Sequence, residues 1–251
     1  MTASNWHSTL EPRNNGEPAL RLGLHLIKGL SEDAAQRIVA ARQQAQFTDS
    51  ADFFRRTVLN KRDLNCLADA NALLQLTGHR RNALWHTLGK LNDELPLAVN
   101  SSPETQIDLL APSEGENIVA DYRRLGLTLG RHPLALLRPK LKTMKVITAE
   151  ELASTPPQRG ILAAGIVTCR QRPGTAHGVV FVTLEDETGC INVVVWNALV
   201  ERQRRELLGS RLLGVHGIVE RKDGVTHLIA GKLVDYSKLL GGLLVGSRDF
   251  H

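Results

Sequence analysis

The sequence predicts an α+β multidomain protein in which an all-α domain is followed by a five-stranded β-barrel. Apolar residues recur at helical spacing up to about residue 144, and from Gly160 onward they follow the two-residue period of strands. Residues 96–117 are rich in Pro, Ser, Asn and Gly, which indicates a linker. We therefore predict a tail (1–19), a helical domain (20–95), the linker (96–117), a helical connection (118–144), a barrel domain (145–238) and a C-terminal tail (239–251).

The composition is that of a mildly basic globular protein. The chain has 31 Lys and Arg against 26 Asp and Glu, a net charge of +5, which suits a polyanion partner without requiring one. No apolar run approaches the roughly 20 residues that a membrane span needs, and the start of the chain has no apolar signal segment, so we expect a cytoplasmic location and no membrane partner. The three cysteines are far apart and are expected to be buried rather than disulfide-bonded or metal-bound.

Residues 19–42 predict a helix, a short turn and a second helix. In a helix-hairpin-helix, the turn glycine lets the backbone approach a phosphate, and the first N–H groups of the second helix point at it. Ser31 stands where the second hairpin glycine would be, and the two acids after it would repel a phosphate. The turn is therefore either a phosphate contact or simply a tight helical corner packed in the core, and the sequence leaves both interpretations open. The candidate DNA-binding residues of this turn are Lys28, Gly29, Leu30 and Ser31.

Further helices are predicted along the rest of the helical domain. One lies within Phe47–Leu59, Asn60 caps the next, Asn71–Leu73 is a degenerate second hairpin, and Thr77 caps a last helix. Basic residues gather near these turns. They form either a solvated face or, in paired helical hairpins, a set of DNA contacts: Arg55, Arg56, Lys61, Arg62, Arg80 and Arg81.

The linker contains a short amphipathic island, Gln106, Ile107, Asp108, Leu109 and Leu110. Such a peptide can dock as an extended anchor in a partner's groove, or its apolar residues can fasten the linker to a domain. Beyond it we predict a helix over 118–130 that His132-Pro133 ends, a short helical piece before Pro139, and a solvated lysine-rich run to Lys145.

Five strands are predicted in the second half, at 161–171, 179–184, 191–196, 211–220 and 225–233, with a helix at 198–208 between the third and fourth. This is the order of an oligonucleotide-binding (OB) fold, which binds single strands with the face of strands 2 and 3 and with the loops between strands 1–2 and 4–5. Phe181 and Trp196 are either core residues or base partners. The candidate DNA contacts are Arg170, Arg172, His177, Phe181, Arg221 and Lys222.

No catalytic constellation is visible in the chain. The only acidic cluster of the barrel, Glu185–Glu187, is interpreted as a solvated turn, and the histidines have no metal-ligand spacing. We therefore expect no catalytic residue, no metal and no cofactor in this chain.

Several strings in the chain resemble the C-terminal part of bacterial C-family DNA polymerases, and among them the damage-inducible, error-prone paralogues of the replicative alpha subunit. The strings are Leu20–Leu24 with Lys28–Ser31, Gly78–Trp85, Asp121-Tyr122 with Gly126-Leu127 and His132-Pro133, Arg170–Gly189, and Ser247–His251. The resemblance implies that a parent enzyme adds nucleotides past lesions during SOS mutagenesis and DNA repair. The magnesium expected for the parent and the palm that binds it are not expected in this chain.

The resemblance also implies partners. In the replicative relative, tandem helix-hairpin-helix motifs hold duplex DNA, the OB domain lies near the single-stranded template, and an internal pentapeptide binds the sliding clamp, in the place that Gln106–Leu110 takes here. In mutasomes an inactive Y-family polymerase homologue is a partner. Two functions follow: a DNA-binding module, or mainly a protein-interaction module that docks a mutasome partner or the clamp through Gln106–Leu110 and an apolar tail that includes Phe250.

Overall fold

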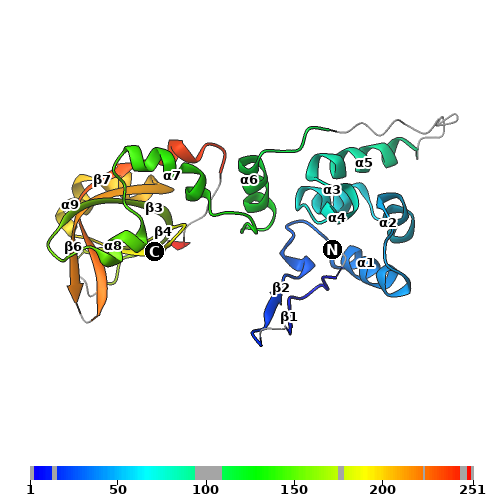
Figure 1. Cartoon of the computed structure of the whole chain (residues 1–251), viewed down its shortest axis with the longest axis horizontal. Helices are drawn as coiled ribbons and strands as arrows, with labels where there is room; N and C mark the ends of the chain where they lie inside the picture. Colours follow the sequence, from blue (N-terminus) through cyan, green and yellow to red (C-terminus); the bar gives the residue numbers. More distant parts are fainter. Residues whose placement is uncertain are drawn as a thin grey trace. The chain divides into compact units, whose positions relative to one another are not determined.

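The computed structural model describes residues 3–12, 16–93, 109–174, 178–222, 224–243 and 248–249. The chain forms two compact units, Met1–Leu129 and Gly130–His251, whose elements are labelled in Figure 1. Each unit has its own hydrophobic core. No described helix combines the length and the apolar character that crossing a bilayer requires.

Helices of the amino-terminal unit begin where the sequence provides caps. Ser31, Asp49 and Asn60 precede α1, α2 and α3, and each side chain accepts a hydrogen bond from a backbone N–H of the first turn. Ile38 and Phe53 lie fully inside the core that these helices enclose. The elements are β1 (Thr9–Glu11), β2 (Ala19–Arg21), the 3₁₀ turn η1 (Leu24–Leu26), α1 (Glu32–Gln44), α2 (Ser50–Thr57), α3 (Lys61–Asp69), α4 (Leu74–Thr77), α5 (Arg80–Asp93) and α6 (Glu114–Arg124).

The predicted amino-terminal tail contributes a strand. β1 pairs antiparallel with β2, which places Leu10 opposite Leu20, and Glu11 forms an ion pair with Arg21 across the two strands. The helical unit therefore also carries a small sheet, and the first helix of the predicted helix-turn-helix is reduced to η1. Each strand has only three residues, which is too few for a two-residue period to be recognised in the sequence.

Two helix starts differ from the prediction. Thr77 ends α4 and does not cap α5; His79 does so, because its Nδ1 accepts an N–H of the first turn of α5 at 3.2 Å. α6 begins before the predicted start at Ile118, because Ser113 and Glu116 form a capping box in which each side chain binds the other residue's backbone N–H. The Ser-x-x-Glu spacing of that box is present in the sequence.

The carboxy-terminal unit is a closed barrel. Its five long strands pair in the order β4-β5-β7-β6-β3, and β3 also pairs with β4. β5 and β7 run parallel and the other barrel pairs antiparallel. The predicted strand order is confirmed, and the predicted single helix is two short ones. The elements are α7 (Pro133–Thr143), α8 (Ala149–Ser154), β3 (Gly160–Gln171), β4 (Val180–Asp186), β5 (Gly189–Val195), α9 (Asn197–Arg202), α10 (Arg204–Gly209), β6 (Leu212–Lys222), β7 (Val225–Asp235), η2 (Ser237–Leu240) and β8 (Arg248–Asp249).

Strand β3 closes the barrel by serving two neighbours. Its first part pairs with β6 and its last part with β4, with a register irregularity between Val167 and Cys169. Gly165 lies where β3 passes close to β4, and a Cβ atom there would be 2.7 Å from the Cβ of Leu184. Because no larger residue fits at that distance, glycine at this position allows the strand to curl.

Two segments flanking the barrel are more ordered than predicted. His132-Pro133 starts α7 instead of ending a helix, since proline suits the first helical position. α7 continues through Pro139 to Thr143, where we had predicted a solvated run. The predicted C-terminal tail begins within η2, Leu240 is buried, and β8 pairs with β3. Apolar residues that we had assigned to partner docking are thus partly used by the barrel itself.

Because His132 caps α7, we expect the stability of the carboxy-terminal unit to depend on pH. Nδ1 of His132 accepts the N–H of Leu134 at 3.2 Å, which requires the neutral ring, and burial lowers the pKa of His132 although Glu185 and other nearby carboxylates oppose it. The folded state therefore binds the proton less readily than the unfolded state. The contribution of His132 to the free energy of unfolding should be complete above a pH of about 6.5. It should decline as the pH falls from there through the folded-state pKa of His132.

Thermal unfolding at pH 7.5 and pH 5.5 measures this dependence. In His132→Asn, a side chain that caps without titrating in this range, the loss of melting temperature between the two pH values should be smaller than in the wild type. An equal loss in both proteins would show that other groups cause it.

Candidate nucleic-acid interface

The predicted hairpin turn Lys28–Ser31 has the backbone of a tight helical corner. Gly29 has a φ of +88°, and both Lys28 and Gly29 are exposed, whereas Leu30 is buried. Ser31 donates its N–H to Oδ1 of Asp63 at 3.1 Å and its hydroxyl to Oδ2 at 3.2 Å. A buried carboxylate thus takes the donor that we had assigned to a phosphate. Leu30 and Ser31 serve the turn itself, and Lys28 and Gly29 remain candidate contacts.

The second predicted hairpin, between α3 and α4, has a similar turn. Asn71 stands in the place of a glycine with a φ of +56°, a conformation that Asn adopts more readily than most residues. Its N–H donates to the carbonyl of Ala68 at 3.0 Å, and its own carbonyl accepts the N–H of Leu74 at 3.3 Å. Both predicted hairpin turns are therefore built on one residue with positive φ.

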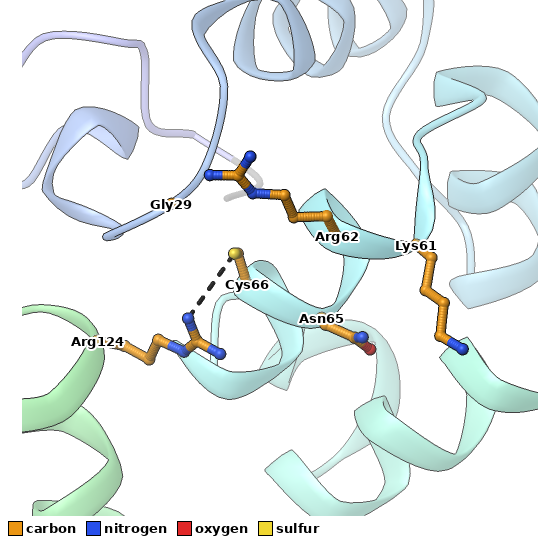
Figure 2. Close-up of a pocket in the computed structure, with 6 residues that line it drawn as sticks. All are labelled: Gly29, Lys61, Arg62, Asn65, Cys66 and Arg124. Atoms are coloured by element: carbon orange, nitrogen blue, oxygen red, sulfur yellow. Dashed lines mark hydrogen bonds between the residues drawn. The ribbon is translucent and has the colours of Figure 1, made fainter.

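A depression of about 550 Å³ opens beside the first turn (Figure 2). In Figure 2 the guanidinium groups of Arg62 and Arg124 lie on the Gly29 side, and Lys61 extends along the other. Lys61 and Arg62 are exposed and have no ion-pair partner among the described residues. The sequence prediction included Lys61 and Arg62 but missed Arg124, because nothing local relates it to α3. The lining residues are Gly29, Lys61, Arg62, Asn65, Cys66 and Arg124.

Other predicted arginine contacts of the helical unit are engaged within the protein. Arg80 is 6% exposed and forms an ion pair with Asp121. Arg56 donates to the carbonyl of Ala45 at 2.7 Å and is mostly covered. Arg55 is 78% exposed and has a surface ion pair. Arg80 and Arg56 therefore hold helices together in this structure and present no free guanidinium to a phosphate.

Two predicted arginine contacts of the barrel are likewise engaged. Arg170 is 5% exposed, and it donates from Nε to the carbonyl of Leu207 at 2.7 Å and from Nη2 to that of Ser210. It joins β3 to the end of α10 and cannot serve a ligand at the surface. Arg221 donates to the carbonyl of Thr155 at 3.2 Å, after α8, although the side chain is exposed.

An apolar row crosses the outside of the barrel. The pairing register aligns Phe181 on β4 with Val194 on β5, Ile229 on β7 and Ile218 on β6. Phe181 and Ile218, at its two ends, are 38% and 48% exposed, whereas the neighbouring inward residues of these strands form the core. Trp196, just after β5, is 55% exposed. The two-residue alternation in the sequence indicates which side chains point outward. Only the pairing register of the strands shows that these four side chains form one row.

Basic residues lie at two loops of the barrel. Arg172 follows β3 and Lys222 ends β6, and both are exposed without an ion-pair partner in the described part of the chain. The described part of the barrel surface thus carries one row of aromatic and aliphatic side chains, and cations at two loops. His177, also predicted for the first loop, lies outside the described residues.

The end of the predicted docking peptide is held by its backbone. Nε2 of His79 lies 2.8 Å from the carbonyl oxygen of Leu109, and Arg81 donates to the carbonyl of Leu110 at 2.9 Å and to Glu116 at 2.7 Å. The side chain of Leu110 is 83% exposed. Arg81 therefore positions this segment. The other predicted docking residues lie outside the described residues: Gln106, Ile107, Asp108 and Phe250.

The cysteines differ in exposure. Cys66 is buried, Cys169 is partly buried and Cys190 is exposed, so the prediction that all three are buried is confirmed for Cys66 alone. Burial raises the pKa of the Cys66 thiol, which keeps it neutral at physiological pH. Among the described residues, no group of three or more His, Cys, Asp or Glu side chains could hold a metal ion.

Two family models match the two units. Residues 1–83 match the helix-hairpin-helix motif, and residues 161–236 match the OB-fold nucleic acid binding domain. Fold and comparison agree that the chain carries two modules of nucleic-acid-binding classes in series.

Matches to curated proteins extend over the whole chain. An error-prone DNA polymerase of Alkalilimnicola ehrlichii is 55% identical over 249 residues, which are 99% of this chain and 24% of that protein. The error-prone DNA polymerase of Azoarcus sp. is 51% identical over 256 residues, which cover 100% of this chain and 24% of that protein. The chain is a relative of bacterial error-prone DNA polymerases, fits a C-terminal region of such a protein, and spans about a quarter of its length.

Solved structures resemble part of the chain only distantly. Asparaginyl-tRNA synthetase from Pyrococcus horikoshii is 24% identical with a TM-score of 0.31, over 36% of this chain and 22% of that chain. So slight a likeness supports no further conclusion.

Proposed function

We propose that this chain is the DNA-binding and partner-docking segment of an error-prone translesion DNA polymerase, active in damage-induced (SOS) mutagenesis and DNA repair. Nucleotide addition is assigned to the rest of the enzyme. The observation that carries the proposal is the apolar row of the barrel, with Phe181 exposed at one end. Arg172 after β3 and Lys222 at the end of β6 add exposed cations that have no ion-pair partner among the described residues. Aromatic faces stack on bases, and cations follow the phosphates of a single strand.

Within this proposal the two units take different forms of DNA. The barrel takes the single-stranded template, whose unpaired bases can reach Phe181 and the aliphatic row. The helical unit takes the duplex through its phosphates at Lys28, Gly29, Lys61 and Arg62, which are exposed. Phosphate contacts of this kind position DNA without reading its sequence, as a polymerase that must move along any template requires.

The test is to titrate the chain with labelled single-stranded and duplex oligonucleotides at 50 and 200 mM salt. If about three phosphates are neutralised, single-strand affinity should fall about 20-fold between these salt concentrations. Phe181→Ala should weaken single-strand binding by about 1–3 kcal/mol, because one stacked base is lost. The matched control is Trp85→Ala, which removes a 43% exposed aromatic side chain from the other unit and should leave single-strand affinity unchanged.

Protein docking is the second candidate function. It is favoured by Leu110, whose backbone is held by Arg81 while its side chain is 83% exposed. The candidate partners are a mutasome protein, in particular an inactive Y-family polymerase homologue, and the sliding clamp. In the same titration, failure of both forms of DNA to bind at 50 mM salt would support docking alone and contradict the DNA-binding function.

A further inference from the structure

The depression beside the first hairpin receives a side chain from outside the matched helix-hairpin-helix motif. That motif ends at residue 83, whereas Arg124 is the last residue of α6. The N–H of Lys28 donates to the carbonyl of Arg124 at 2.9 Å. This bond ties the end of α6 to the hairpin turn. The Arg124 side chain lines the depression together with Gly29, and in Figure 2 its guanidinium reaches toward Cys66.

The Arg124 guanidinium is held by a carboxylate in this structure. Its Nε donates to Oδ2 of Asp69 at 2.9 Å, and Nη2 pairs with the same oxygen. Nη1 lies 3.9 Å from the thiol of Cys66. The side chains of Arg124 and Asp69 are 29% and 30% exposed, so both are reachable from solvent. A partly exposed ion pair of this kind is weak enough for a second anion to compete with it.

The charges around the depression favour an anion. Lys61, Arg62 and Arg124 line it. Asp69 binds Arg124, and the nearby Asp63 is buried and bound to Ser31. Gly29 has no side chain to keep a ligand away from the backbone. Arginine forms paired hydrogen bonds with phosphate oxygens. The depression therefore suits a phosphate group that bridges the guanidinium groups of Arg62 on α3 and Arg124 on α6.

We propose that Arg124 completes a phosphate-binding site for the duplex DNA backbone in this depression, and that Asp69 competes with the phosphate for Arg124. The inference rests on the proposed DNA-binding function and adds to it a residue outside the helix-hairpin-helix match. Because Asp69 competes with the phosphate for Arg124, removing the Asp69 carboxylate should strengthen duplex binding.

The experiment measures duplex binding by the full chain and four variants at several salt concentrations. Arg124→Ala should weaken binding about tenfold and lower the slope of log affinity against log salt by about one. Asp69→Asn should strengthen binding, and Asp69→Asn combined with Arg124→Ala should lose most of that gain. Arg123→Ala is the matched control, because Arg123 is the exposed neighbour on α6 and does not line the depression. It should change affinity less than twofold.

The outcomes separate the inference from the function on which it rests. If the wild type binds duplex DNA but Arg124→Ala equals Arg123→Ala, or if Asp69→Asn gains fully without Arg124, the inference is overturned and the function stands. If the wild type does not bind DNA, the function itself fails. Thermal unfolding of each variant checks that it folds. If Arg124→Ala is unstable, Asp69→Asn still tests the inference, because it must bind duplex DNA more tightly than the wild type.

Inorganic phosphate is the probe for the alternative source of this chemistry. A duplex site predicts that millimolar phosphate only competes with DNA. Stabilisation of the wild type by phosphate alone, lost in Arg124→Ala while duplex affinity is unchanged, would reassign the depression to a free phosphate.

Discussion

Replacing Arg80 by alanine is expected to destabilise the amino-terminal unit by about 3 kcal/mol, because it breaks a largely buried ion pair and leaves a carboxylate without its cation. Arg80 Nη1 donates to Oδ1 of Asn117 at 2.7 Å, and Nη2 binds Asp121. These bonds join the start of α5 to α6. Urea unfolding at neutral pH, followed by circular dichroism, measures the change in the free energy of unfolding.

The adjacent residue provides the control for this prediction. Arg81 is 39% exposed and pairs with the 55% exposed Glu116, so Arg81→Ala should cost no more than about 1 kcal/mol. Both arginines were predicted as DNA contacts from the sequence. An Arg80→Ala protein with wild-type stability and weakened DNA binding would contradict the structural role and restore the original interpretation.

Arg138→Ala is expected to destabilise the carboxy-terminal unit by about 3–5 kcal/mol. Arg138 on α7 is 8% exposed; its Nη2 donates to Asp186 at 3.2 Å and to Glu187 at 2.9 Å. These bonds raise the pKa of Arg138, with Glu187 the largest cause. Asp186 also accepts the N–H of Ala149 at 2.8 Å. The arginine thus fastens α7 and the start of α8 to the β4–β5 turn, which we had interpreted as solvated.

Thermal unfolding of Arg138→Ala should show this loss, and Lys140→Ala supplies the control. Lys140 lies on the same helix and is exposed, so its removal should change stability by less than about 0.5 kcal/mol. If Arg138→Ala were as stable as Lys140→Ala, the contacts of Arg138 would contribute nothing to the barrel's stability.

Arg80 and Arg138 show why a binding site is hard to predict from sequence alone. A basic residue is available to a ligand only if the fold supplies it with no internal acceptor. Arg80 finds Asp121 across 41 positions, and Arg170 finds the carbonyl of Ser210 across 40. Arg62, in the same predicted set as Arg80, stays exposed because no acceptor folds onto it among the described residues.

The sequence by itself determined the order of the five barrel strands, the helical cap at Asn60 and the general class of both units. These features depend on neighbouring residues, through side-chain alternation, turn residues and first-turn hydrogen bonds. The tertiary structure alone decided which arginines remain free, that Phe181 aligns with Ile218, and that Arg124 lines the same depression as Gly29. Such pairings depend on strand register and on contacts between distant segments, which local patterns do not encode.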